Sequence, residues 1–215
     1  MITTLKLLRF LGPTLLFFGS FVVLPPLLMS YFNNLVDSEL LWTYVFCIAY
    51  SLLIMFTLRR QKFSYSPRDG FIITFLTWVF ISVLAAMPFL NSNMSFFDAL
   101  FEAVSGLTTT GSTVIEDLSR LPDHILLYRQ LLQWAGGVGL VIVVLAIIPA
   151  VSGGMKVLQA ETSGFADKTF SPRLRETARS LLKFYFLITL ACVVSYWLAG
   201  MSWFEAFCHS FSTVS

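Results

Sequence analysis

Five stretches of this 215-residue chain contain no aspartate, glutamate, lysine or arginine. They are residues 10–32, 40–58, 70–90, 130–151 and 184–200. A helix of roughly 20 apolar residues spans the hydrocarbon core of a bilayer, so each stretch approaches the required length. The last is the shortest, but Lys183 beside it can extend its amine to the interface and lengthen the span. The sequence therefore predicts an all-α polytopic membrane protein with five transmembrane helices.

The basic residues predict which way these helices cross the membrane. Twelve of the fourteen lie before the first stretch, between the second and third, or between the fourth and fifth, all on one side. Cytoplasmic loops are enriched in lysine and arginine, so we expect the N-terminus in the cytoplasm and residues 91–123 outside. The charged residues behind the formal net charge of +2 are thus distributed unevenly across a membrane, and this net charge does not indicate nucleic-acid binding.

These spans divide the chain into four expected segments. Residues 1–69 form a transmembrane hairpin with a basic cytoplasmic loop, and residues 70–151 form a helix–pore–helix repeat. Residues 152–179 are a cytoplasmic connector, and residues 180–215 an incomplete second repeat. The pair Pro25–Pro26 is expected to bend or end the first helix near its outer end, because proline lacks an amide proton.

A short amphipathic segment, residues 95–107, follows the third span and is too short to cross a bilayer. Ser95 and Asp98 fit a capping box at its start. Its large apolar residues are expected to form the packing face; they are Phe96, Phe97, Leu100, Phe101 and Val104. Non-helical backbone survives at membrane depth only where it lines a protected, wet cavity. We therefore predict a re-entrant pore helix that leads into residues 108–113.

Residues 108–113 have the composition expected of an ion filter. They are rich in hydroxyl groups and contain Gly111, which permits backbone angles closed to other residues. Successive carbonyls can then face one side and replace the hydration shell of a cation, while the helix C-terminus adds partial negative charge. The alternative is an outer loop with a short interfacial helix, in which the threonines are merely β-formers.

Two polar residues of the fourth span, Arg129 and Gln133, share a helix face because they lie four residues apart. We expect them to support the filter, through its backbone or through the Glu116–Asp117 pair. The alternative is that Arg129 reaches lipid headgroups. The glycines that follow predict close helix packing, with Ala135 and Gly139 as a small-residue pair, because no βαβ context supports a nucleotide-binding fingerprint.

The remaining chemically active residues do not form an enzyme site. His124 is expected to be solvated next to Asp123, and His209 accompanies no ordered serine and aspartate. The three cysteines are dispersed in apolar surroundings without metal-ligand spacing, so we expect buried small hydrophobes; they are Cys47, Cys192 and Cys208. We therefore predict no enzymatic activity and no cofactor.

An internal repeat with an offset of 107 residues relates Ser95–Ala99 to Ser202–Ala206. Over 14 pairs, four are identical: Ser95/Ser202, Phe97/Phe204, Ala99/Ala206 and Ser105/Ser212. Both copies follow a predicted span directly, and His209 falls where Glu102 lies in the first copy. The second copy reaches Ser215 where its filter would begin, so we expect a chain truncated within this motif.

At this point the sequence resembles the TrkH/KtrB superfamily of potassium transporters. Residues 101–113 are similar to the first filter of that superfamily, and the Gln-Trp-x-Gly-Gly pattern that begins at Gln133 is similar to the span behind it. Residues 173–178 and 209–211 resemble its second connector and second pore helix. Two spans ahead of the first repeat fit the TrkH branch better than the shorter KtrB branch.

The resemblance implies potassium transport through a channel-like pore of a Trk-type uptake system in the bacterial inner membrane. Thr109 and Thr110 would offer backbone oxygens to potassium, or to sodium as the alternative ion, with Thr108 and Gly111 framing them. Ser112 and Thr113 would support the filter. The implied partners are lipid, the remaining pore repeats, a second copy in a homodimer and a cytoplasmic nucleotide-binding TrkA-like regulator.

A second hypothesis belongs to another functional class. One complete repeat supplies one quarter of a filter, and one quarter of a ring does not dehydrate an ion by itself. The alternative function is therefore a truncated, non-conducting membrane remnant, or a scaffold whose spans dock against other helices.

Overall fold

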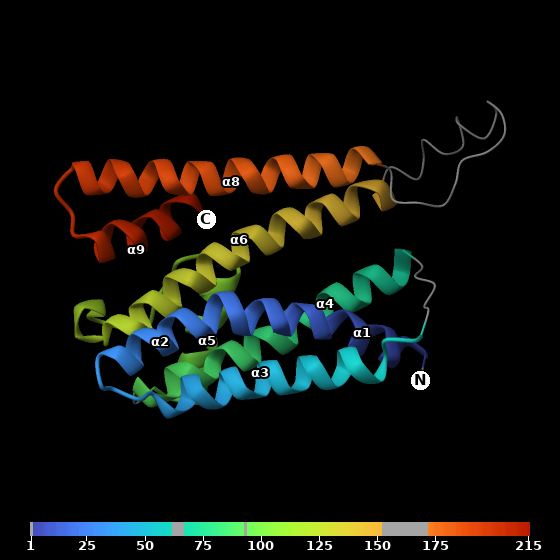
Figure 1. The fold of residues 1–215 in the computed structure, drawn as a ribbon, viewed down its shortest axis with the longest axis horizontal. Helices are drawn as coiled ribbons and strands as arrows, with labels where there is room; N and C mark the ends of the chain where they lie inside the picture. The colour runs from blue at the N-terminus through green and yellow to red at the C-terminus, as the bar shows by residue number, and fades with distance from the viewer. Residues whose placement is uncertain (1, 62–66, 93, 152–171) are drawn as a thin grey trace.

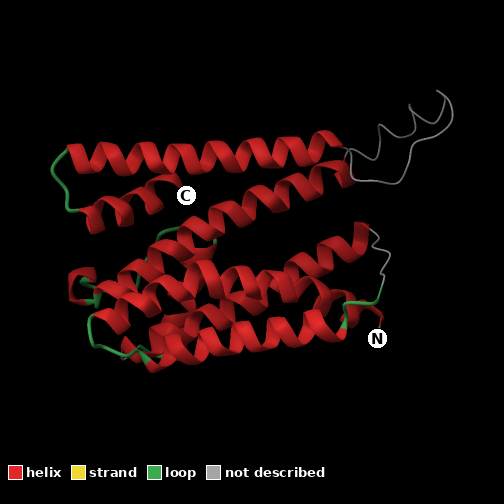
Figure 2. Ribbon diagram, in the orientation of Figure 1, coloured by secondary structure: helices red, strands yellow, loops and turns green. Residues whose placement is uncertain are grey.

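The computed structural model describes residues 2–61, 67–92, 94–151 and 172–215, and every regular element within these ranges is a helix (Figure 2). Four helical segments are long and apolar enough to cross a membrane: Thr4–Phe32, Ser38–Thr57, Asp69–Ser92 and Glu176–Leu198. They coincide with the first, second, third and fifth predicted spans. The fourth predicted span falls within helix α6, Asp123–Val151, and stays a prediction.

The first span continues through its two prolines. Helix α1, Ile2–Phe17, leads into a π-helical segment, Phe18–Val23, and then into α2, Leu24–Phe32. The wider π turn, in which the Leu24 amide donates to the Gly19 carbonyl, lets the chain enter Pro25–Pro26 without a break. Of the two predicted outcomes, an end of the helix at these prolines is wrong, because the helical span continues to Phe32, and a bend there stays a prediction.

Close contacts hold the N-terminal hairpin together. Helix α3, Ser38–Thr57, packs against α1, and a Cβ atom placed on Gly19 would lie 2.9 Å from the Cβ atom of Cys47. The Ser51 hydroxyl donates to the Gly12 carbonyl across the same interface (2.7 Å). Cys47 is fully buried there, as the sequence predicts.

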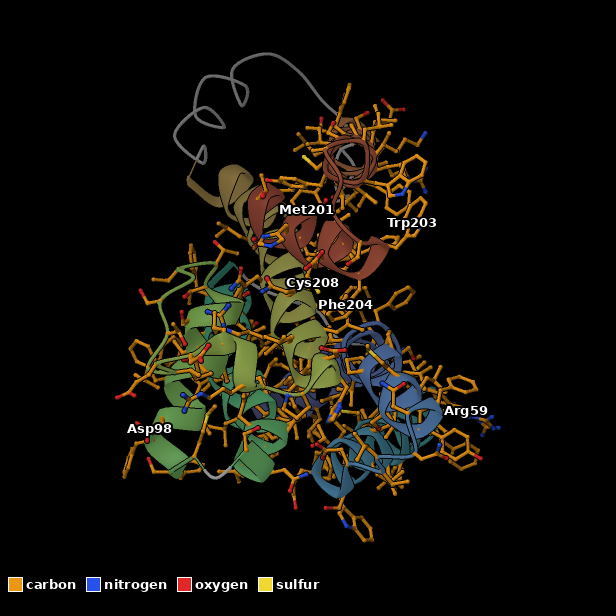
Figure 3. The ribbon with its side chains drawn as sticks, turned by 90° about the vertical axis from the view of Figure 1, so that its left-hand side faces the viewer. Arg59, Asp98, Met201, Trp203, Phe204 and Cys208 are labelled. Atoms are coloured by element: carbon orange, nitrogen blue, oxygen red, sulfur yellow. The ribbon has the colours of Figure 1, made fainter. Side chains whose placement is uncertain are left out.

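Helix α6 lies at the centre of the fold. Helix α4, Pro67–Ala86, continues as a 3-10 helix, Met87–Ser92, and is followed by α5, Phe96–Leu107. Helices α8, Pro172–Leu198, and α9, Trp203–Val214, pack together on the opposite side of α6 from the N-terminal hairpin (Figure 1). A view turned by 90° shows Asp98 on α5 and Trp203 on α9 on opposite sides of α6 (Figure 3).

Helices α5 and α9 reproduce the internal repeat. Each is 12 residues long, and α9 begins and ends 107 residues after α5. Equivalent positions are buried, Ala99 with Ala206 and Ala103 with Ser210. Residues 152–171 of the predicted connector lie outside the described residues, and from Pro172 the chain is already helical in α8.

Candidate functional site

The N-terminus of α5 carries half of the predicted capping box. The Asp98 amide donates to the Ser95 hydroxyl oxygen (3.2 Å), but the Asp98 carboxylate accepts the Ser95 hydroxyl proton (2.7 Å), not the backbone amide of Ser95. The second helix has the complete box, because Glu205 also accepts the backbone amide of Ser202 (3.0 Å). Aspartate is one methylene shorter than glutamate and does not reach back that far.

The buried face of α5 is its small-residue face. The predicted packing face is wrong for four of its five residues, because Phe96, Phe97, Phe101 and Val104 are exposed; only Leu100 packs against the core. The buried side is instead formed by residues at helical spacing, which are Ala99, Glu102, Ala103 and Gly106. Small side chains let the backbone of α5 approach its neighbours closely, and large ones on that face would hold it away.

A glycine on α6 fixes the contact between α6 and the end of α5. A Cβ atom on Gly136 would lie 2.8 Å from the carbonyl carbon of Leu107, which is too close for any real side chain. Gly106 of α5 faces α6 in turn, where an added Cβ would meet that of Leu132 at 3.1 Å. Gly139, expected to form a small-residue pair with Ala135, only reaches ordinary contact with Trp78. Between these two glycines of α6, Gly136 therefore requires glycine and Gly139 does not.

The C-terminus of α5 is closed by a Schellman motif. The Thr109 amide donates to the Gly106 carbonyl (2.9 Å) and the Thr110 amide to the Ser105 carbonyl (3.0 Å). This motif needs one residue in the left-handed region, and Thr109 occupies that position with a φ of +57°. Gly111 follows with a φ of +75°, so the backbone turns twice within three residues.

Two other helices end in the same way, which makes Thr109 conspicuous. Helix α2 closes at Asn34 (φ +54°) and α8 at Gly200 (φ +100°), the residue types that favour this conformation. A β-branched residue there is a true outlier and costs roughly 1–2 kcal/mol. Backbone strain of this kind collects at functional sites, where the surrounding structure holds it in place.

Three backbone carbonyls after α5 are open. Among the residues that the structure describes, none donates a hydrogen bond to the carbonyls of Thr108, Thr109 or Thr110. The Ser112 carbonyl accepts the Ser105 hydroxyl (2.6 Å), and the Gly111 carbonyl accepts Nη2 of Arg129 (3.1 Å). A carbonyl committed to a guanidinium is a poor ligand for a second cation. Among the described residues, the carbonyls of Thr108, Thr109 and Thr110 are thus free of protein hydrogen bonds, whereas that of Gly111 is not.

Glu102 was not predicted as a site residue, but its carboxylate binds both the end of residues 108–114 and Arg129. Its Oε1 atom accepts the Thr113 hydroxyl (2.6 Å) and the Val114 amide (2.8 Å). Its Oε2 atom accepts Nε of Arg129 (3.0 Å), and the carboxylate is fully buried. The sequence signal that could have identified Glu102 is its position on the same helix face as the buried Ala99 and Ala103. Threonine hydroxyls add local bonds, as Thr108 donates to the Val104 carbonyl (2.8 Å).

Arg129 contacts the backbone of the predicted filter, at the Gly111 carbonyl, which is one of the two contacts expected from the sequence. Its guanidinium is buried and bridges Glu102 and the Gly111 carbonyl, so it does not reach lipid headgroups. Gln133, one turn along α6, is also buried, but no hydrogen bond of its side chain occurs within the described residues. Leaving one partner of a buried ion pair alone costs about 3–5 kcal/mol, so Glu102 and Arg129 depend on each other.

His124 at the start of α6 is buried, and the expectation that it is solvated is wrong. Its Nε2 atom lies 3.2 Å from Oδ2 of Asp37, which also caps α3. Burial raises the pKa of Asp37, but hydrogen bonds from His124, the Leu40 amide and Asn91 outweigh it and hold the pKa below its usual value. The contact joins the N-terminal hairpin to the helix that carries Arg129.

Comparison with known proteins agrees with this arrangement. The family described as cation transport protein, TrkH, matches residues 37–215, which is most of the chain. The chain belongs to the TrkH family. This family transports cations and is not a family of enzymes.

Individual TrkH relatives cover nearly the whole chain. The Trk system potassium uptake protein TrkH of Vibrio parahaemolyticus is 39% identical over 215 residues, which make up 98% of this chain and 44% of that protein. TrkG of Escherichia coli strain K12 is 41% identical over 204 residues, 91% of this chain and 42% of that protein. The chain spans less than half the length of these relatives.

A solved structure of the family shares the fold. The crystal structure of the potassium transporter TrkH from Vibrio parahaemolyticus matches with a TM-score of 0.79 and 36% sequence identity. The match covers 98% of this chain and 42% of that chain. The helical arrangement around α6 is therefore that of a TrkH protein.

Proposed function

We propose that this chain forms part of a channel-like pore for potassium in a Trk-type uptake system. The observation that carries the proposal is the set of open carbonyls at Thr108, Thr109 and Thr110, placed at the C-terminus of α5. Backbone carbonyls replace the hydration shell of a potassium ion, and the helix end adds partial negative charge. Thr109 and Thr110 hold the ion, and Ser112, Thr113, Arg129 and Gln133 support them.

The membrane arrangement is part of the proposal. The chain crosses a bacterial inner membrane five times with its N-terminus in the cytoplasm, and α5 is a re-entrant helix, as the basic residues indicate. The four-segment division at residues 69, 151 and 179 follows. Further repeats complete the filter, because a ring of carbonyls needs more than one segment. The exposed Phe97 and Phe101 then face lipid or those repeats.

Named relatives support the ion and the partners. Proteins that match this chain are called Trk system potassium uptake proteins, and a multi-component system implies association beyond one chain. We propose a homodimer in the membrane and a cytoplasmic nucleotide-binding TrkA-like subunit. We propose potassium and not sodium as the transported ion, because these relatives are named potassium uptake proteins.

Gly111 provides the test. Replacing it by valine creates no clash, since no atom lies within 4 Å of an added Cβ. A valine at a φ of +75° is nevertheless strained. We expect the gene product that contains this chain to restore growth of an uptake-deficient bacterium in limiting potassium, and Gly111→Val to abolish it. Gly70→Val, equally open in α4, is the matched control and should grow normally.

Two outcomes would contradict the proposal. Normal potassium uptake by Gly111→Val, at equal abundance in the membrane, would show that the backbone at this position takes no part in transport. Failure of the unsubstituted protein to accumulate potassium or its analogue rubidium would support the non-conducting scaffold instead.

A further inference from the structure

An ion pair lies directly behind the segment with the open carbonyls. Nη2 of Arg129 is 3.1 Å from the Gly111 carbonyl, the next carbonyl after that of Thr110. The guanidinium keeps its positive charge at any physiological pH. A positive charge at this position in a buried, low-dielectric region repels a cation bound to the neighbouring carbonyls. Arg129 without a neighbouring negative charge would therefore orient the Gly111 carbonyl and at the same time weaken the binding of a cation to the neighbouring carbonyls.

Glu102 supplies the opposite charge at the same place. Its Oε2 atom lies 3.0 Å from Nε of Arg129, and both side chains are almost completely buried. The other carboxylate oxygen accepts hydrogen bonds from Thr113, the last residue of the predicted filter, and from Val114, which follows it. A buried carboxylate with both oxygens occupied is fixed in position, so its field at the segment is constant.

We propose that Glu102 cancels the charge of Arg129 behind the filter and thereby sets the affinity for the passing cation. This inference rests on the proposed transport function. Glu102 is a positioning residue, because it acts through Arg129 and the backbone without touching the ion. Arg129 orients the Gly111 carbonyl, and Glu102 makes that orientation compatible with a bound cation.

Charge compensation predicts opposite effects for the two partners. Glu102→Gln keeps the volume and one acceptor for Thr113 and Val114 but leaves the charge of Arg129 unbalanced. We expect its KM for rubidium uptake to rise about fivefold or more. Arg129→Gln leaves a negative charge behind the filter, so its KM should fall and its maximal rate should drop because release is slower. A merely structural pair would shift both KM values upward.

The test compares initial rates of rubidium uptake by cells that express the full gene product, at equal membrane abundance. Glu116→Gln is the matched control, because it removes a carboxylate from the same segment at an exposed position. Its KM should stay within about twofold of that of the parent. The double variant E102Q/R129Q removes both charges, and its KM should lie between those of the single variants.

Three results would overturn the inference. The first is an unchanged KM for E102Q, and the second is a similar rise in KM for E102Q and R129Q. The third is failure of E102Q and E102Q/R129Q alike to reach the membrane, because the carboxylate would then be needed for folding whatever the charge at Arg129. Each presupposes that the unsubstituted protein takes up rubidium; absence of uptake by that protein contradicts the proposed function instead.

Discussion

Helices α5 and α9 occupy equivalent places in the repeat, yet their polar residues are arranged differently. In α5 the buried Glu102 binds the segment that follows the helix, together with Arg129. The equivalent position in α9 is His209, which is exposed and lies near the ring of Tyr196. At the N-terminal caps, α9 has more of the polar contacts than α5, since only α9 has the complete capping box.

The comparison separates what the scaffold requires from what the site requires. Small buried residues recur at equivalent positions, Ala99 with Ala206, because both helices need close approach to a neighbour. The capping serines recur as Ser95 and Ser202, but the buried Glu102 does not, because His209 occupies its position in α9. In the proposed pore, the repeats would therefore not be identical, and the polar residues of one repeat would not predict those of the next.

The largest effect is expected where α6 supports α5. Gly136→Ala would place a methyl group against the Leu107 carbonyl and force α6 away from the end of α5. We expect a loss of about 3 kcal/mol or more in stability, measured by denaturant titration of the purified protein in detergent, together with loss of potassium uptake.

Gly139→Ala is the control for this substitution, because Trp78 is only in ordinary contact with that position. It should change stability by less than about 0.5 kcal/mol. Equal losses for the two variants would show that α6 packs on α5 without the close approach at Gly136.

An intermediate effect is expected at the strained end of α5. Thr109→Gly relieves the left-handed threonine and should stabilise the protein by about 1 kcal/mol, while potassium uptake becomes weaker because the carbonyls lose their fixed direction. Gly200→Thr places a threonine in the same motif at the end of α8 and should destabilise by about 1 kcal/mol. Thermal unfolding in detergent and uptake at limiting potassium measure the two effects. A stabilised Thr109→Gly variant with unchanged uptake would mean that the strain has no functional purpose.

Hydropathy and spacing predicted the elements of this fold. Four predicted spans coincide with apolar helices, and the offset of 107 residues reproduces both ends of α9 from those of α5, because these signals are local in the sequence. The contact between Arg129 and the segment at Gly111 also followed from a shared helix face. Large phenylalanines misled the prediction of the packing face, since in a membrane apolar size does not indicate burial against protein.

Burial of polar residues could not be read from the sequence in the same way. Glu102 and His124 are buried because Arg129 and Asp37, distant in the sequence, arrive from other helices to bind them. The left-handed Thr109 was equally invisible, because threonine is the wrong residue type for a Schellman motif. Site residues that break a local rule are the ones that pattern analysis misses.

The smallest effect is expected at the two N-terminal caps. Asp98→Glu adds the methylene that lets the carboxylate reach the Ser95 amide, as Glu205 reaches the Ser202 amide in α9. Completing the box should raise the Tm of the purified protein by about 1–2 °C, because one more free amide of the first turn is bonded. Glu205→Asp should lower the Tm by removing the same bond from α9. Changes of the same sign in both variants would show that the difference between the caps comes from tertiary contacts, because side-chain length alone gives opposite signs.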